Sequence, residues 1–188
     1  IVPFYNIISH FDILFITLRD YVNSLNCEII IIDDFSNYDI FCCLNEYIEK
    51  LRADNIFLFR NKENGGAAFS RQKGVELARG EYIFFLDADD GWVKNRAFIL
   101  YDYAKLNSVN IMGGFTVAIN KDVFLDKRNS NFNVMNLRPL CFNNFLFKNF
   151  FSTPSVVVKK DIFLKHGFDT EMRYSEDFEC WRRVVIDG

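Results

Sequence analysis

The chain has 188 residues, of which 50% are apolar, and its 22 basic and 25 acidic residues give a formal net charge of −3. That length suits one domain with a sizeable core, and the near balance of charges argues against a nucleic-acid binder that works through bulk positive charge. Five cysteines without Cys-x-x-Cys spacing predict reduced thiols in the cytoplasm rather than a disulfide framework or a zinc site, and no apolar run reaches the ~18 residues of a membrane span.

The first half of the chain alternates short apolar runs with segments of helical spacing. The runs predicted to be strands span residues 1–4, 27–32, 55–61 and 81–86. The predicted helices span residues 10–25, 39–53 and 67–78. Apolar residues recur every three or four positions in these helices, whereas apolar runs without alternation are typical of strands covered on both faces. The order predicts an α/β fold with a doubly wound, mostly parallel sheet, whose ligands bind outside the carboxyl ends of the strands.

After residue 95 the alternation loosens. We predict a helix at 96–106, one or two strands within 110–119, a polar segment at 121–138 with a loop at 127–133, and a strand followed by a short helix within 155–168. The Phe-rich stretch from Leu140 to Pro154 has the spacing of a helix with a broad apolar face. We expect a single domain over residues 1–188, with a regular half at about 1–95 and a less regular half at about 96–188. Because the chain opens and stops within predicted elements, we expect it to be a fragment.

Three carboxylates, Asp87, Asp89 and Asp90, directly follow the apolar run that ends at Leu86. Alternate side chains of a strand point to one side, so Asp87 and Asp89 converge if the strand geometry persists. Carboxylates without neighbouring histidines suit Mg²⁺ or Mn²⁺, whose remaining positions are usually filled by water and phosphate. The triplet therefore indicates a metal–phosphate site, and the alternative is a solvated acidic turn. An EF-hand is disfavoured because no Glu occupies its twelfth position, and a phosphatase motif because Gly91 replaces its hydroxyl-bearing residue or valine.

Polar residues also follow the second predicted strand and open the third predicted helix. Asp33 and Asp34 can accept hydrogen bonds from a base or from ribose hydroxyls, although such a pair also occurs in plain turns with a helix cap. Gly66 lies where a helix begins, and backbone amides at that position favour an anion. Arg71, one to two turns further on, faces either a phosphate or the solvent.

The last polar motif is the pair Glu176 and Asp177, which is followed by aromatic residues. A carboxylate beside aromatic side chains in a cleft can act as a general base. The alternative is structural, because acidic residues also suit the positive end of a helix that begins there.

The order of four motifs resembles that of the family 2 glycosyltransferases with the GT-A fold. These motifs are "VPFYN", "EIIIIDDFS", "NGGAAFSRQKGVELARGEYIFFLDADD" and "SEDFECWRR", and the resemblance covers nearly the whole chain. It implies a nucleotide-sugar donor, commonly a UDP-sugar, and a divalent ion, Mn²⁺ or Mg²⁺. The regular half of the chain then binds the nucleotide sugar, and the second half binds the acceptor.

The resemblance also implies roles for individual residues. Those implied to bind the nucleotide sugar are Pro3, Tyr5, Asp33, Asp34, Gly66, Arg71 and Asp87. Asp89, together with Asp87, is implied to hold the metal. Asp177 is implied to be the general base of an inverting transfer, with Glu176 supporting it. In that chemistry the base deprotonates an acceptor hydroxyl, and the metal offsets charge on the departing diphosphate.

The implied acceptor is a glycan or a lipid-linked sugar, as in the synthesis of surface polysaccharides. Residues 121–165 hold eight basic and three acidic residues and include the Phe-rich stretch. We expect that stretch to pack into the core, with a wall of the acceptor cleft and a peripheral contact at the inner face of a membrane as alternatives. We expect no nucleic-acid partner, and the oligomeric state is open.

The chain departs from the family pattern at a few positions. Phe35 stands where the family usually has a small residue, often Gly, so that it either crowds the turn or stacks near the base. Ser70 and Gln72 flank Arg71 where Ala and Asn are more typical. Two other functions are alternatives: a module that binds nucleotide sugars without turnover, and a sugar nucleotidyltransferase. The latter requires a Gly-rich basic loop after the first strand, and "PFYNIISHFD" lacks it.

Overall fold

The computed structural model describes residues 1–9, 11–114, 116, 118–130, 149, 151–172 and 174–187. Its elements, in chain order, are β1 (Val2–Phe4), α1 (Phe11–Leu18), β2 (Ile29–Asp33), α2 (Tyr38–Leu51), β3 (Ile56–Arg60), α3 (Gly66–Leu77), β4 (Tyr82–Phe84), α4 (Arg96–Leu106), β5 (Ile111–Met112), α5 (Lys121–Lys127), the 3₁₀ turn η2 (Thr153–Ser155), β6 (Val157–Lys159), α6 (Lys160–His166) and α7 (Glu176–Asp187). The predicted alternation of strands and helices in the first half is confirmed.

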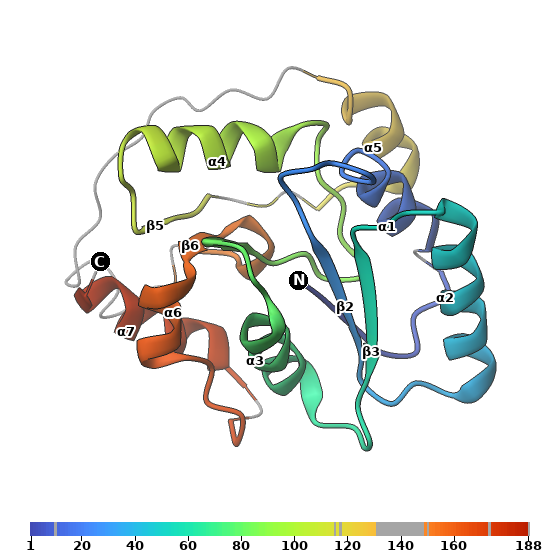
Figure 1. The fold of residues 1–188 in the computed structure, drawn as a ribbon, viewed down its shortest axis with the longest axis horizontal. Coiled ribbons are helices and arrows are strands. Elements are labelled where there is room, and N and C mark those ends of the chain that lie inside the picture. The colour runs from blue at the N-terminus through green and yellow to red at the C-terminus, as the bar shows by residue number, and fades with distance from the viewer. Residues whose placement is uncertain are drawn as a thin grey trace.

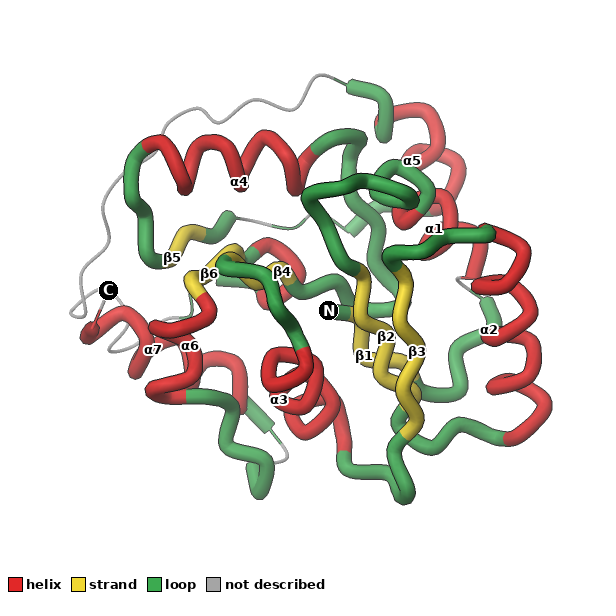
Figure 2. The backbone as a smooth tube through the Cα atoms, viewed as in Figure 1, coloured by secondary structure: helices red, strands yellow, loops and turns green. Residues whose placement is uncertain are grey.

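Strands β1, β2 and β3 form a parallel sheet with a common carboxyl edge. Phe4 of β1 is paired with Asp33 of β2, and Asp33 is paired with Arg60 of β3. The three strands therefore end side by side (Figure 2), so that the residues following them gather at one edge. This register decides which polar side chains can meet a common ligand.

The remaining strands, β4, β6 and β5, form a second sheet in that spatial order. Both β4 and β5 pair antiparallel with β6. Ile1 connects the two sheets, because its amino group donates to the carbonyl of Phe84 at 2.8 Å and its carbonyl accepts from the amide of Leu86 at 3.0 Å. That pattern is the one of neighbouring parallel strands. Among the described strands only β6 therefore runs against the others, and the prediction of a mostly parallel sheet is confirmed.

Helices cover both faces of the parallel sheet, which explains the uninterrupted isoleucine run of β2. Ile29 and Ile31 pack into a core with residues of α1 and α2. Ile30 and Ile32 point the other way, into a core shared with α3, α6 and α7. The arrangement of layers is visible in Figure 1, with α1 and α2 on one side of β2 and β3, and α3 on the other. A strand buried on both faces has no place for alternating polar residues.

Helix α1 is shorter than the segment predicted to be helical, residues 10–25. It ends at Leu18, and the side chain of Asn55 holds the chain that follows. The Asn55 amide donates to the carbonyls of Tyr21, at 2.9 Å, and Cys27, at 3.0 Å, while its oxygen accepts from the amide of Asn23. Asn23 has a positive φ of 58°. Bonds from one distant side chain thus replace the helical pattern, which spacing alone cannot predict.

The second half contains a helix, α5 (Lys121–Lys127), in a segment that was predicted only to be polar, with a loop at 127–133. Its cap is the side chain of Asn120, which accepts from the amide of Val123 at 2.9 Å, and its apolar anchor is the buried Phe124. Of the strands predicted within 110–119, only β5 is present among the described residues. Most of the Phe-rich stretch, residues 140–148 and Phe150, lies outside the described residues.

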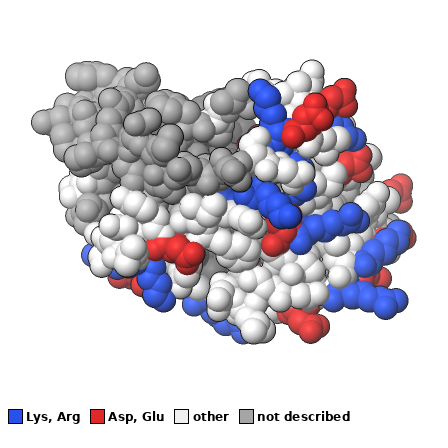
Figure 3. Space-filling view, turned by 90° about the horizontal axis from the view of Figure 1, so that it is seen from above, with Lys and Arg blue, Asp and Glu red and all other residues white. Residues whose placement is uncertain are grey.

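Charged side chains of both signs are interspersed over the described surface seen in Figure 3. No helix in the described part of the chain combines the length and the apolarity needed to cross a membrane.

Candidate functional site at the carboxyl edge

Asp34 lies just beyond β2 and anchors the start of α3. Its carboxylate accepts hydrogen bonds from the backbone amides of Gly65 and Gly66, at 3.0 and 2.7 Å, and from the side chain of Asn61 at 2.7 Å. An acidic group is favoured here because the first amides of a helix carry partial positive charge. These bonds use three of the about four acceptor positions of the carboxylate, and Asp34 is only 3% exposed, so a contact between Asp34 and a base remains a prediction.

Gly66 adopts a backbone conformation that side chains disfavour, with φ at +85°, and this conformation presents its amide to Asp34. We expect Gly66→Ala to lower the stability by about 1 kcal/mol through backbone strain alone, because a Cβ at this position would have open space around it. For a domain of this size the thermal midpoint should fall by about 2–4 °C. Gly114→Ala is the matched control, since its Cβ also meets open space but its φ is not positive. Equal midpoints for the two variants would contradict this prediction.

Arg71 joins three predicted site segments. Its guanidinium lies 2.6 Å from Oδ1 of Asp87, beyond β4, and 3.5 Å from Oε1 of Glu176, at the start of α7. The Arg71 side chain is only 8% exposed, and its charge centre lies 5.8 Å from the centre of the Phe168 ring. Opposite charges offset the cost of removing an arginine from water. The contact thus brings the phosphate, metal and base motifs of the sequence to one place.

The acidic triplet does not continue as a strand. The chain turns at Ala88 and Asp89, and the amide of Asp90 donates to the carbonyl of Asp87 at 3.0 Å. Ala88 is buried, Asp87 is partly exposed and Asp89 is exposed. Asp87 and Asp89 were predicted to converge only if the strand continued, and it does not. The described residues include no cluster of three metal-binding side chains. The donor set still fits Mg²⁺ or Mn²⁺, because Arg71 engages only Oδ1 of Asp87 and both carboxylates supply hard oxygens.

Asp177 lies beside Glu176 in the first turn of α7 and is held by two residues that the motifs did not indicate. Its Oδ2 accepts from the side chain of Asn149 at 3.1 Å and lies 3.5 Å from the hydroxyl of Thr153. Its Oδ1 accepts from the amide of Phe178 at 2.7 Å. Asn149 and Thr153 are more than twenty residues away in sequence, and no local pattern relates them to Asp177.

The remaining predicted donor residues belong to β1 and β2 or directly follow them. Pro3 is buried within β1, and Tyr5, directly after the strand, is about half exposed. Asp33 is fully buried, where its Oδ2 lies 3.4 Å from Nε of Arg60 and its Oδ1 accepts from the amide of Ser36 at 3.3 Å. Asp33 therefore stabilises the carboxyl edge from within the protein, whereas Tyr5 lies at the surface. A contact between Asp33 and a base remains a prediction that this geometry does not favour.

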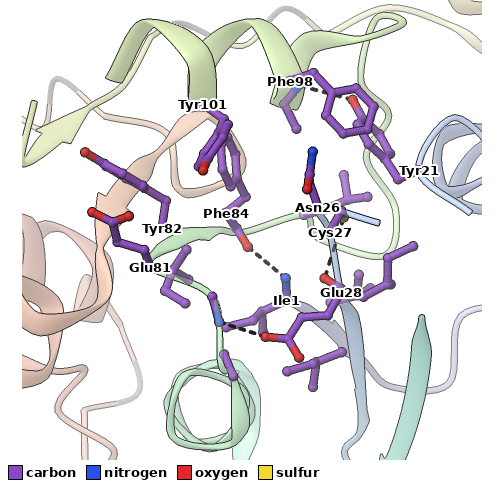
Figure 4. A pocket seen from close by; sticks show the side chains of 18 of the residues that line it. Ile1, Tyr21, Asn26, Cys27, Glu28, Glu81, Tyr82, Phe84, Phe98 and Tyr101 are labelled. Atoms are coloured by element: carbon purple, nitrogen blue, oxygen red, sulfur yellow. Dashed lines mark hydrogen bonds between the residues drawn. The ribbon is translucent and has the colours of Figure 1, made fainter. Parts of the chain in front are cut away.

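A cavity of about 680 Å³ lies at the other end of the sheet and contains none of the predicted site residues. Its walls include Ile1 and Glu28 on one side and the aromatic residues Tyr82, Phe98 and Tyr101 on the other (Figure 4). Because ligands of parallel α/β sheets bind beyond the carboxyl ends, we place the candidate site at the opposite edge, around Arg71.

The fold places the ends of three parallel strands, the start of α3 and the buried Arg71 at one edge, which is where α/β sheets of this kind bind their ligands. Comparison with known families makes the assignment specific: residues 1–168 match glycosyl transferase family 2, and the chain belongs to that family.

Known proteins similar to the chain support the same assignment. The Escherichia coli UDP-Glc:alpha-D-GlcNAc-diphosphoundecaprenol beta-1,3-glucosyltransferase WfaP is 39% identical over 71 residues, which are 38% of this chain and 27% of WfaP. Residues 1–349 of Staphylococcus aureus TarS, in complex with UDP-GlcNAc, give a TM-score of 0.74 at 17% identity, covering 98% of this chain and 52% of that one.

A mannosyltransferase from Pyrobaculum calidifontis, in complex with GDP-Man and Mn²⁺, gives a TM-score of 0.73 at 15% identity and covers 100% of this chain and 51% of that one. At these identities the two structures show the fold alone, which is that of GT-A glycosyltransferases, as predicted. The chain spans only part of the length of its curated relatives, 54% of one and 29% of another.

Proposed function

We propose that the chain is the donor-binding and catalytic domain of a metal-dependent inverting glycosyltransferase. It moves a sugar from a nucleotide sugar, in our proposal a UDP-sugar, to a hydroxyl of a glycan or lipid-linked acceptor. The observation that carries the proposal is the position of Arg71 between Asp87 and Glu176. Three motifs from distant parts of the chain meet there, at the edge where ligands of this fold bind.

The donor is proposed to lie across the carboxyl edge, from Tyr5 to the acidic turn. The half-exposed ring of Tyr5 suits the base and ribose, and the buried Asp34 holds the start of α3 in place at the same edge. Arg71 suits the diphosphate, because it places a positive group beside the acidic turn. Asp87 and Asp89 would hold Mg²⁺ or Mn²⁺, which supplies positive charge that stabilises the leaving diphosphate.

The protein's own chemistry in the transfer step is the removal of a proton from the acceptor. Asp177 accepts the proton of the acceptor hydroxyl, whose oxygen then attacks the anomeric carbon from the face opposite the nucleotide. The bond from that carbon to the diphosphate breaks, so the configuration is inverted. Asn149 and Thr153 hold Oδ2 of Asp177, and a base held in one orientation loses less entropy on reaching the transition state.

The names of the similar proteins agree with this proposal. WfaP is named for a UDP-Glc donor and a diphosphoundecaprenol-linked acceptor, TarS is bound to UDP-GlcNAc, and the mannosyltransferase is bound to a nucleotide sugar and Mn²⁺. A role in the synthesis of surface polysaccharides, in contact with a membrane-bound acceptor, belongs to the same proposal. Thermal-shift screening of UDP-, GDP- and dTDP-sugars with Mn²⁺ would identify the donor.

The metal assignment is tested by Asp89→Asn. Loss of a residue that merely supports a metal ligand costs about 10–100-fold in metal affinity, so loss of the ligand itself should weaken Mn²⁺-dependent binding of UDP by about tenfold or more. Isothermal titration with UDP, with and without Mn²⁺, measures this. Asp102→Asn, which changes an exposed acid of α4, should bind as the parent does. Unchanged Mn²⁺ dependence in Asp89→Asn would refute the assignment, and absence of UDP release from every UDP-sugar tried with Mn²⁺ would favour a binding module.

A further inference from the structure

Phe35 occupies a backbone conformation that is unfavourable for its side chain. Its φ is +65°, and it is the only aromatic among the described non-glycine residues with positive φ. Three of the other six are Asn, which tolerates this region better. Its ring is nevertheless 49% exposed, so burial of the ring does not account for the strained position. Strain that the surrounding structure maintains points towards a function.

The turn that carries Phe35 is fixed by bonds on both sides. The amide of Asp34 donates to the carbonyl of Phe4 at 2.7 Å, and the hydroxyl of Ser36 accepts from the amide of Asn6 at 2.9 Å. The guanidinium of Arg60 donates to the carbonyl of Ser36 at 2.6 Å. These bonds connect the segments that follow β1, β2 and β3, so the position of Phe35 at the carboxyl edge is set before any ligand arrives.

Arg60 also supports the ring of Phe35. The charge centre of its guanidinium lies 5.4 Å from the centre of the Phe35 ring and 4.3 Å from that of Phe41. The buried Asp33 lies 3.4 Å from Nε of the same arginine. Because Asp33, the carbonyl of Ser36 and the ring of Phe41 all hold Arg60, its guanidinium is fixed beside the ring of Phe35.

We propose that Phe35 is a stacking platform for the base of the donor nucleotide. The inference rests on the proposed function, since it deepens the assignment of the same edge. Phe35 lies beyond β2, as the half-exposed Tyr5 lies beyond β1, and its own ring is 49% exposed at the edge proposed to bind the donor. The planar heteroaromatic ring of a base can stack on such an exposed aromatic face. A diphosphate without a base has no ring to stack on Phe35, so its binding should not depend on that residue.

Phe35→Asn tests the platform, because Asn removes the ring and tolerates a positive φ. Base–aromatic stacking is worth about 1–3 kcal/mol per base, so binding of UDP with Mn²⁺ should weaken about tenfold. Binding of inorganic pyrophosphate with Mn²⁺ should stay within about twofold of the parent. Phe35→Tyr keeps the ring and should restore the affinity for UDP. The thermal midpoint of Phe35→Asn should not fall below that of the parent, because strain is relieved.

The outcomes separate this inference from the proposed function. If the parent binds no nucleoside diphosphate with Mn²⁺, the proposed function fails and the inference falls with it. If the parent binds UDP and Phe35→Asn binds it equally well, only the stacking role is wrong. Equal weakening of UDP and pyrophosphate, or a thermal midpoint below that of the parent, would show that the ring is structural and would also overturn the inference.

Discussion

Asp177→Asn is expected to transfer sugar about 10²–10⁴-fold more slowly than the parent while binding UDP and Mn²⁺ with unchanged affinity, because it removes a general base but no donor contact. The amide oxygen can still accept from the backbone of Phe178, so the start of α7 should survive. The NH2 group can donate to the hydroxyl of Thr153, whereas the bond from the Asn149 side chain is lost. The rate of UDP release in the presence of acceptor measures transfer, and titration calorimetry measures donor binding.

The matched control for this variant is Asp161→Asn. Asp161 lies in the first turn of α6, and its Oδ1 accepts from the amide of the next residue, Ile162, at 2.8 Å, much as Asp177 does at the start of α7. Asp161 is exposed and belongs to no predicted site. Asp161→Asn should therefore reproduce any effect on the helix start without slowing transfer. Transfer at the parent rate by Asp177→Asn would show that another group is the base.

The first half of the fold was predictable because burial imposes a simple pattern on it. Isoleucines at 29–32 face helices on both sides of β2, and such a strand needs an apolar residue at every position. The end of α1 and the start of α5 were not predictable in the same way. One depends on the distant Asn55 and the other on the Asn120 cap, and neither side chain changes the apolar spacing.

The sequence indicated which residues lie together at the candidate site better than it indicated how they are arranged. The order of the motifs indicated that Arg71, Asp87 and Glu176 belong to one site, and the structure brings these three together. The spacing of Asp87 and Asp89 suggested two side chains on one face of a strand, but the chain turns at Ala88 and Asp89 instead. The sequence did not indicate Asn149 and Thr153, because their contact with Asp177 depends on how the second half folds.

Arg71→Met is expected to lower the stability by about 2 kcal/mol. Removing one partner of a buried ion pair costs about 3–5 kcal/mol because the other charge is left uncompensated. Asp87 and Glu176 have side chains 26% and 20% exposed, so water screens part of that cost. The thermal midpoint should fall by about 4–8 °C for a domain of this size. Binding of UDP should weaken too, since the guanidinium is the proposed partner of the diphosphate.

A second substitution separates charge from packing in this prediction. Adding Asp87→Asn to Arg71→Met removes one of the two uncompensated carboxylates, so part of the lost stability should return, as a double-mutant cycle would show. Arg79→Met is the matched control, because Arg79 is paired with Glu28 but its side chain is 78% exposed. An exposed pair contributes about 0–1 kcal/mol, and its loss should hardly move the midpoint. If the two arginine variants unfold at the same temperature, Arg71 does not hold the three segments together. The contacts of Arg71 would then no longer support the proposed site.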